Sequence, residues 1–289
     1  MADKNKRLST NVDGEFYVDS TCINCDTCRQ LAPDTFQEIG DYSTVYSQPA
    51  NQVQVRKALQ ALLCCPTGSI GTAQKNEAQA VMSDFPLLIE DDVYYAGFNS
   101  PKSYGGNSYF IKHADGNWLV DSPKFVRPLV EKLAELGGVR YVFLTHRDDV
   151  AEASKYAEHF GSQRIIHRAE LSAEPRSEIV LDGFDPQPFG QEFLIVPTPG
   201  HTKGHCVLLY KNRYLFTGDT LEWDRDQKRL DVHDPRYCWY SWEEQTRSME
   251  RLRELTFAWV LPGHGQRGKV TPEQARRQLL EVVERMEAL

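Results

Sequence analysis

The 289-residue chain has no apolar run long enough to cross a membrane. Residues 1–11 are polar and charged, and they lack the apolar core of a secretory signal peptide. Cysteine is scarce after residue 66, where only Cys206 and Cys238 occur, so disulfides contribute little to the larger part of the chain. Together these absences predict a protein of the reducing cytoplasm without a membrane span.

An excess of positive charge is also missing. The chain has 33 Lys and Arg against 41 Asp and Glu, which gives a formal net charge of −8. An acidic chain repels phosphate backbones unless its cations gather in one patch. The nearest approach to a patch, Arg251, Arg253, Arg276 and Arg277, has the spacing of solvated helix faces. We therefore expect no nucleic-acid partner.

Five of the seven cysteines come before residue 66. Cys22, Cys25 and Cys28 have the spacing C-x-x-C-x-x-C, and Cys65-Pro66 follows later in the chain. Three close thiolates, a distant fourth and a following proline are typical of a 4Fe-4S site. A structural zinc site is the alternative, although zinc usually takes two separated C-x-x-C pairs. Cys64 does not fit the pattern, and we expect it to be a buried neighbour.

The residues around these cysteines extend the motif. Phe16-Tyr17-Val18-Asp19 precedes it, Ala32-Pro33-Asp34-Thr35-Phe36 follows the third cysteine, and Cys65-Pro66-Thr67-Gly68-Ser69-Ile70 ends it. Over residues 11–72 the chain resembles the single-cluster 4Fe-4S ferredoxins of the bacterial type. The resemblance implies a 4Fe-4S cluster bound by Cys22, Cys25, Cys28 and Cys65. Because a cysteine and not an aspartate stands at position 25, all four ligands are available.

The order of apolar and polar residues predicts two domains. Residues 54–64 have helical spacing, Pro66-Thr67-Gly68 ends that helix, and the composition of residues 73–86 is that of a linker. We therefore expect a domain at 1–72, a linker at 73–86 and a second domain at 87–289. Strand-like runs in the second domain fall at 93–95, 107–111, 118–120, 141–144, 164–166, 193–196, 206–210, 214–216 and 258–261. Helical patterns fall at 123–136, 149–160, 242–255 and 272–287. This order predicts an α+β fold of two mixed sheets flanked by helices.

Four polar residues each follow the end of a predicted strand: His146, His201, Asp219 and His264. Glycine precedes three of them directly, which lets the backbone turn sharply and bring the side chains toward one rim. Neutral imidazole and carboxylate are ligands that zinc or non-haem iron takes at such a place.

The segments Thr145-His146, Gly200–His205, Thr217–Thr220 and Pro262–Gly265, in this order, resemble the metallo-β-lactamase superfamily. The resemblance runs from about residue 90 to 266, and Leu119-Val120-Asp121-Ser122 matches an early strand and loop of that family. It implies an αββα sandwich with a metal site at the rim. Members usually carry His-x-His-x-Asp-His after the first strand, whereas this chain has His146-Arg147-Asp148-Asp149-Val150-Ala151. The start of this loop is similar to the His-x-Glu-x-Asp loop of flavodiiron proteins, a redox branch of the superfamily, and the similarity ends at Val150.

The altered loop determines which ligands we expect. His146, Asp148, His201 and Asp219 are predicted to hold one metal, and His264 with Asp219 a second one more weakly. A carboxylate in place of an imidazole favours iron or manganese over zinc. Asp149 and Glu152 have the spacing of a helix capping box, so Asp149 is predicted to be a cap. His205 is predicted to form a hydrogen bond at the start of its strand, and His233 with residues 237–242 is a candidate substrate lid.

Three functions remain open at this point. The first is a metal-dependent hydrolase that acts on an ester, thioester or similar bond of a small molecule, with a redox-active or sensory cluster. Asp148 or Asp219 would then accept or orient the proton of the attacking water. The second is an oxidoreductase that passes electrons from the cluster to a non-haem iron site and is served by a redox partner protein. The third is a non-catalytic binding or assembly protein with a degraded metal site.

Overall fold

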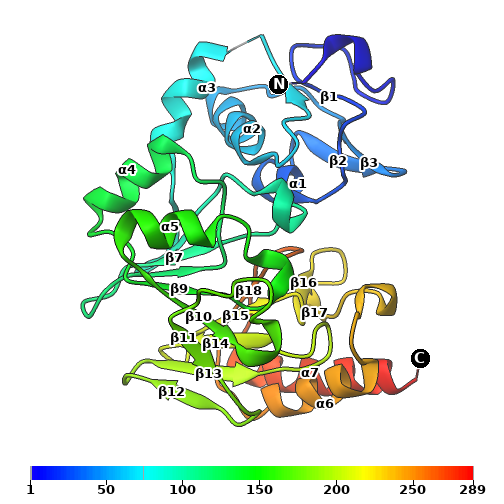
Figure 1. Cartoon of the computed structure of the whole chain (residues 1–289). Coiled ribbons are helices and arrows are strands. Elements are labelled where there is room, and N and C mark those ends of the chain that lie inside the picture. Colours follow the sequence, from blue (N-terminus) through cyan, green and yellow to red (C-terminus); the bar gives the residue numbers. More distant parts are fainter. Residues whose placement is uncertain (1, 74, 289) are drawn as a thin grey trace.

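The computed structural model describes residues 2–73 and 75–288, and it places a small N-terminal domain on one side of a larger two-sheet domain (Figure 1). In the N-terminal domain, β1 (Tyr17–Val18) pairs with β4 (Ile70–Gly71), and β2 (Phe36–Ile39) forms a hairpin with β3 (Tyr42–Val45). Helices α1 (Thr27–Leu31) and α2 (Gln52–Cys64) pack against each other. The antiparallel pairing of β1 with β4 returns the end of α2 to the loop that follows β1. This return brings Cys65 back to the first three cysteines.

The segment between the domains is helical. Within the predicted linker, α3 (Lys75–Val81) is followed by the 3-10 helix η2 (Met82–Asp84), while residue 74 lies outside the described residues. Ala78 and Val81 are buried, and Gln60 of α2 donates a 2.8 Å hydrogen bond to Asp84. The alanine-rich composition that suggested a linker also has high helix propensity, and packing against α2 selects the helix.

The larger domain consists of two mixed sheets, as predicted. The seven-stranded sheet has the order β11-β10-β9-β8-β7-β6-β5, and the six-stranded sheet has the order β12-β13-β14-β15-β18-β19. Strands of the first sheet are β5 (Leu87–Glu90), β6 (Val93–Tyr95), β7 (Tyr109–Ile111), β8 (Trp118–Val120), β9 (Tyr141–Phe143), β10 (Gln163–His167) and β11 (Ile179–Leu181). Those of the second are β12 (Gln187–Phe189), β13 (Phe193–Pro197), β14 (Cys206–Tyr210), β15 (Tyr214–Gly218), β18 (Trp259–Pro262) and β19 (Gly268–Lys269).

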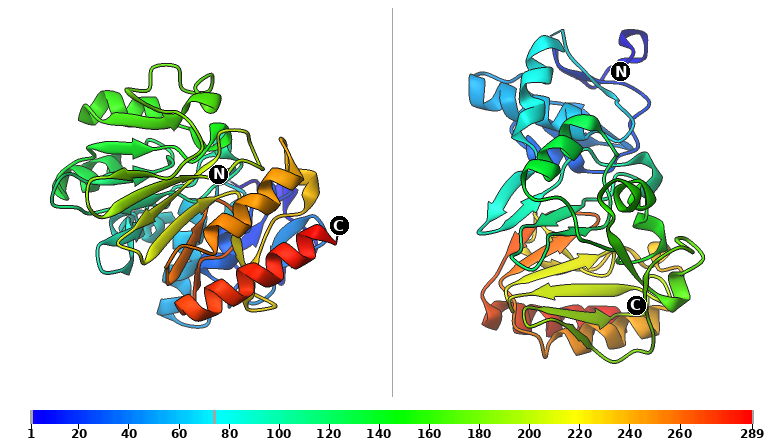
Figure 2. Two further views of the ribbon diagram at one scale, coloured as in Figure 1. Left: turned by 90° about the horizontal axis from the view of Figure 1, so that it is seen from below. Right: turned by 60° about the vertical axis from the view of Figure 1, so that its left-hand side comes forward.

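Helices cover the outer faces of this sandwich. On the side of the seven-stranded sheet lie α4 (Arg127–Glu135) and α5 (Ala153–Phe160), and on the side of the six-stranded sheet lie α6 (Trp242–Leu252) and α7 (Pro272–Glu287) (Figure 2). Strand β14 is buried on both faces, because Leu208 belongs to the core between the sheets whereas Val207 and Leu209 pack in the core beneath α6 and α7. This double burial explains its uninterrupted apolar sequence. Within the described residues, no helix combines the length and apolarity that a membrane span requires.

Candidate cluster and metal centres

The four cysteines predicted to bind a cluster surround one small enclosed cavity in the N-terminal domain. Asn24 and Asp26 adopt left-handed backbone conformations, with φ of 55° and 66°, which curl the loop from Cys22 to Cys28 around this cavity. Backbone amides donate to two of the sulfurs: Asn24 N lies 3.4 Å from Cys22 Sγ, and Ser69 N lies 3.2 Å from Cys65 Sγ. Such donors stabilise thiolate ligands.

The spacing of the sulfurs suits a cluster better than a single zinc ion. In the part of the chain that the structure describes, no three cysteine sulfurs lie within 4.8 Å of one another. One zinc ion with Zn–S bonds of 2.3 Å would place its sulfurs about 3.8 Å apart. Burial raises the pKa of Cys25 to about 11, and burial raises the pKa of Cys28 further. These thiols are therefore protonated at neutral pH in the absence of metal, and binding of a metal cation would be accompanied by loss of their protons.

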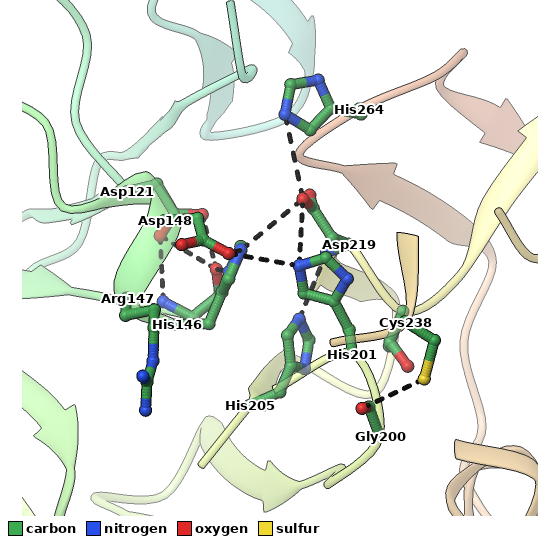
Figure 3. A network of polar contacts seen from close by, with 12 residues as sticks. Asp121, His146, Arg147, Asp148, Gly200, His201, His205, Asp219, Cys238 and His264 are labelled. Atoms are coloured by element: carbon green, nitrogen blue, oxygen red, sulfur yellow. Dashed lines mark hydrogen bonds and ion pairs between the residues drawn. The ribbon is translucent and has the colours of Figure 1, made fainter. Parts of the chain in front are cut away.

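The four polar residues predicted to meet at the rim of the sandwich do meet (Figure 3). His146 follows β9, His201 follows β13, Asp219 follows β15 and His264 follows β18. His146 Nε2 lies 3.7 Å from Asp148 Oδ2 and 3.5 Å from Asp219 Oδ2. His201 Nε2 lies 3.5 Å and 3.6 Å from the same two oxygens. The imidazoles of His146 and His201 therefore face the same two carboxylates.

The ring nitrogens of His146 and His201 that face these carboxylates lack hydrogen bonds, as expected of atoms that would bind a metal ion. The Nε2 atoms of His146 and His201 are buried and have no hydrogen-bond partner, and the same holds for Asp219 Oδ1. Buried polar atoms without a partner are costly, and a bound cation would remove that cost. Metal–nitrogen bonds of 2.0–2.1 Å would place such ligands about 3.4 Å apart, close to the spacing observed. His146, His201 and Asp219 are therefore the core of a first candidate ligand set, and Asp148 joins it through its position beside both imidazoles.

Asp149 belongs to a second candidate ligand set. The prediction that it caps a helix was wrong. Helix α5 begins at Ala153 after Glu152, while Asp149 ends the 3-10 helix η4 (Arg147–Asp149). Its two carboxylate oxygens are buried without a partner. Its ligand atom, with those of Asp219 and His264, forms a group whose members all lie within 4.8 Å. Asp219 thus belongs to both sets, and His264 Nε2 lies 3.8 Å from its Oδ2.

Asp149 lies one residue before the position at which the family motif led us to look for an aspartate. Position-by-position matching placed Val150 where the family carries its aspartate, but the η4 turn and a left-handed Ala151 (φ 33°) change the register of the loop. The Asp149 carboxylate consequently points to the rim. Burial, together with the negative charge of Asp219, raises its pKa well above the usual value.

A hydrogen-bond chain orients His146. Its Nδ1 lies 3.0 Å from Thr145 Oγ1, which lies 3.0 Å from both carboxylate oxygens of Asp121. The Thr145 hydroxyl has one proton and donates it to Asp121, so it accepts from His146 Nδ1. The proton of the neutral ring is then on Nδ1, which leaves Nε2 free to bind a metal.

His205 supports the site without being part of either ligand set. Its Nδ1 lies 2.8 Å from Thr198 Oγ1, and its Nε2 accepts a 3.1 Å hydrogen bond from the Asp219 amide. Burial lowers the pKa of His205 well below its usual value, so the ring is neutral and can accept this bond. The hydrogen-bonding role predicted for His205 therefore serves to position Asp219.

Two glycines are needed because the rim is tightly packed. A Cβ at Gly218 (φ 48°) would lie 2.6 Å from His205 Nε2. A Cβ at Gly263 would lie 2.6 Å from Asp219 Oδ1 and 2.8 Å from Asp149 Oδ2. Close approach of the backbone, in addition to the sharp turn expected from the sequence, explains these glycines.

The rim residues and the cluster loop share one cavity of about 1050 Å³. Cys25 and Asp26 line one side of it, and Asp148, Asp149, His201, Asp219 and His264 line the other. Arg225 follows β16 (Glu222–Asp224), which pairs with β17 (Arg229–Asp231), and it forms an ion pair with Asp26. This contact joins the two sides of the cavity.

Part of the predicted lid also lines this cavity. Tyr237 and Trp239 lie at its wall and are largely exposed, and the Trp239 ring centroid lies 6.1 Å from that of His201. His233 lines the same wall, with Nδ1 at 3.3 Å from Glu222 Oε1. Trp242, by contrast, begins α6 and donates to the carbonyl of Met286. The aromatic wall is therefore limited to the first part of the run.

Two consecutive glycines in the β6–β7 loop lie between the cluster loop and the rim. A Cβ at Gly105 would lie 2.9 Å from Cys25 Cβ and 3.1 Å from its sulfur. A Cβ at Gly106 would lie 2.9 Å from Asp149 Oδ1. Two asparagines bridge the same gap: Asn99 Nδ2 donates to Thr27 Oγ1 at 3.1 Å and to Asn107 Oδ1 at 3.3 Å, and Asn107 Nδ2 donates to the Pro262 carbonyl at 3.2 Å.

Comparison with known protein families agrees with this architecture. Residues 18–72 match the 4Fe-4S single cluster domain of Ferredoxin I. Residues 103–264, more than half of the chain, match the metallo-β-lactamase superfamily.

Individual relatives are distant. The chain is 30% identical over 116 residues to hydroxyacylglutathione hydrolases of Salmonella paratyphi C and Salmonella newport. This segment is 39% of the chain and 46% of each relative, so the chain spans about half the length of the curated relatives it matches.

Solved structures share the fold at low identity. A metallo-β-lactamase family protein from Thermus thermophilus has a TM-score of 0.52 and 18% identity, covering 70% of this chain and 81% of its own. The DIM-1 metallo-β-lactamase has a TM-score of 0.51 and 17% identity, covering 68% of this chain and 95% of its own. The chain therefore belongs to the metallo-β-lactamase superfamily and carries a single-cluster 4Fe-4S ferredoxin domain at its N-terminal side.

Proposed function

We propose that the protein is an oxidoreductase in which a 4Fe-4S cluster at Cys22, Cys25, Cys28 and Cys65 exchanges electrons with iron at the rim of the sandwich. The observation that carries this proposal is the position of Cys25, which lines the same cavity as the rim ligands. The backbone of Gly105 packs against Cys25, and the backbone of the next residue, Gly106, packs against Asp149. A hydrolase would have no need for this proximity.

The composition of the rim site supports iron. Three imidazoles and three carboxylates make up the two ligand sets, and Asp219 is common to both. Carboxylate oxygen is a hard donor that suits iron or manganese better than zinc. Negatively charged carboxylates would also stabilise the higher oxidation state of a bound iron relative to the lower one. When bound, iron at this site would supply the one-electron chemistry.

The surrounding residues bind and orient a small substrate. The cavity volume suits a small molecule, and Tyr237 and Trp239 offer aromatic surface to it on one side. Asp148 is the most exposed rim ligand, with 46% of its side chain accessible from the cavity side. The neighbouring His201 imidazole, whose Nε2 lies 3.5 Å from Asp148 Oδ2, lowers the pKa of Asp148, so Asp148 is a carboxylate at neutral pH and can accept a proton from substrate. Electrons would come from a redox partner protein acting as a one-electron donor.

The proposal is tested on protein purified without air. Iron, sulfide and total metal per chain are measured in the wild type and in Asp219→Ala. We expect four irons in the cluster of both proteins, and additional iron at the rim of the wild type alone. Asp226→Ala is the matched control, because Asp226 lines the same cavity outside both ligand sets. Zinc as the only rim metal, or equal rim metal in Asp219→Ala and wild type, would contradict the proposal.

A metal-dependent hydrolase is the second candidate, favoured by the similarity to hydroxyacylglutathione hydrolases. In that case the rim metal would activate water, and Asp148 would accept its proton. Hydrolysis of a glutathione thioester is measured with the cluster oxidised and with the cluster reduced. Turnover that is equal in both states and lost in Asp219→Ala would favour the hydrolase over the oxidoreductase.

A further inference from the structure

Lys124 connects the sandwich domain to the cluster and takes no part in the proposed chemistry. It lies in the loop that connects β8 to α4, the same loop whose Asp121 supports His146 through Thr145. Lys124 Nζ donates a 3.0 Å hydrogen bond to the carbonyl of Cys65. One short loop therefore contacts the supports of both centres.

The backbone around Lys124 is held in place. Its amide donates to the carbonyl of Phe98 at 2.8 Å, and its carbonyl accepts a 3.0 Å hydrogen bond from the Tyr156 hydroxyl. The side chain is half-buried against the N-terminal domain. A charge fixed in a poorly solvated position acts on its surroundings more strongly than a mobile surface charge.

No carboxylate neutralises Lys124 among the ion pairs of residues 2–73 and 75–288. Arg29, the other cation near the cysteines, differs in this respect, since it pairs with Asp26 at 2.6 Å and with Glu38 at 3.3 Å.

We propose that Lys124 sets the reduction potential of the 4Fe-4S cluster. The reduced cluster carries one more negative charge than the oxidised cluster, so a fixed ammonium beside Cys65 stabilises the reduced form. Net charge near a cluster is one of the factors that determine its potential. This inference requires the cluster but does not require electron transfer to the rim. The titration below can therefore contradict it without contradicting the proposed function, and the rim-metal analysis can contradict the proposed function without contradicting this inference.

The test is a reductive titration of the full chain with dithionite, followed by the electron paramagnetic resonance signal of the reduced cluster. Lys124→Met removes the charge and keeps the length of the side chain. We expect at least a tenfold lower ratio of reduced to oxidised cluster at a given potential, which equals 59 mV for one electron. Lys124→Arg should remain close to wild type. Lys57→Met, an exposed position on α2, makes the same charge change and should leave the potential unchanged.

Lys124→Gln separates the effect of the charge from that of the hydrogen bond. It also replaces Lys124→Met in the comparison if the methionine variant contains no cluster. Glutamine is neutral but can still donate to the Cys65 carbonyl. We expect its potential to fall as in Lys124→Met, with unchanged iron and sulfide content. A wild-type potential in Lys124→Gln, or an equal fall in Lys57→Met, would overturn the proposal.

Discussion

Gly105 lies so close to Cys25 that a Cβ at position 105 would be 3.1 Å from the cysteine sulfur. The next residue, Gly106, is equally close to Asp149 at the rim. The two domains appear in the sequence as separate motifs. In the structure they are in contact beside their candidate metal-binding residues.

Replacing Gly105 by alanine should loosen the cluster loop. The φ of Gly105 is 88°, which costs a non-glycine residue about 1–2 kcal/mol, and the new methyl group would also press on Cys25 and Pro66. Gly40→Ala is the matched control, because Gly40 has φ 60° but no atom within 4 Å of the added Cβ. We expect lower iron and sulfide content in Gly105→Ala alone. Equal cluster content in the two variants would show that the contact with Cys25 is unimportant.

Asp149→Ala distinguishes a ligand from a helix cap. Loss of a cap would lower the free energy of unfolding by about 1 kcal/mol and leave metal binding intact. We expect instead that the variant binds less metal per chain, and that the metal-free protein is at least as stable as wild type, because a buried carboxylate without a partner is removed. The comparison is made by metal analysis and chemical unfolding.

Glu152→Ala is the control for Asp149, since Glu152 is the residue that directly precedes α5 and pairs with Lys102 and Lys155. Its metal content should equal that of wild type. Normal metal content in Asp149→Ala would remove Asp149 from the ligand set.

Thr145→Val should weaken metal binding without removing a ligand. The substitution keeps the shape of the side chain but breaks the link between His146 Nδ1 and Asp121. Loss of such an outer partner typically lowers metal affinity about 10–100-fold. Thr246→Val on α6 removes a hydroxyl that donates to the Trp242 carbonyl within the same helix and should leave the affinity unchanged. Affinities are compared by competition with a chelator.

Metal binding should release protons at neutral pH, and affinity should rise with pH. Burial is the largest single influence on His146 and disfavours its charged form, but the neighbouring carboxylates of Asp219, Asp149 and Asp121 together outweigh it and raise the pKa to about 10 in the metal-free protein. The ring is then protonated at pH 7 and must lose its proton to bind a metal. The gain in affinity with pH should end near pH 10. Calorimetry in buffers of different ionisation enthalpy measures the protons released, and release of none would contradict this protonation state.

The parts of the fold that the sequence predicted are those with a strong local pattern. Strand β14 and helix α7 begin and end where the apolar pattern predicts. The strands β11 and β12 were missed because they are short, partly exposed edge strands whose pairing is decided by their neighbours.

The site was predicted to a similar extent. The expectation that His146, His201, Asp219 and His264 lie together came from their shared position after strand ends and from the family resemblance, and the four side chains do lie at one rim. The role of Asp149 depends on the backbone conformation of Ala151. The proximity of Cys25 to the rim depends on domain packing, for which the two motifs give no local signal.

The most direct test of electron exchange between the two centres is a flash-reduction experiment on iron-loaded protein. A light pulse with a photoreductant reduces the cluster, and the return of its absorbance is followed. We predict a return whose rate does not depend on protein concentration in the wild type, and which is lost in Asp219→Ala with the cluster intact. The same rate in both proteins, or a rate proportional to protein concentration in the wild type, would contradict electron exchange between the cluster and the rim.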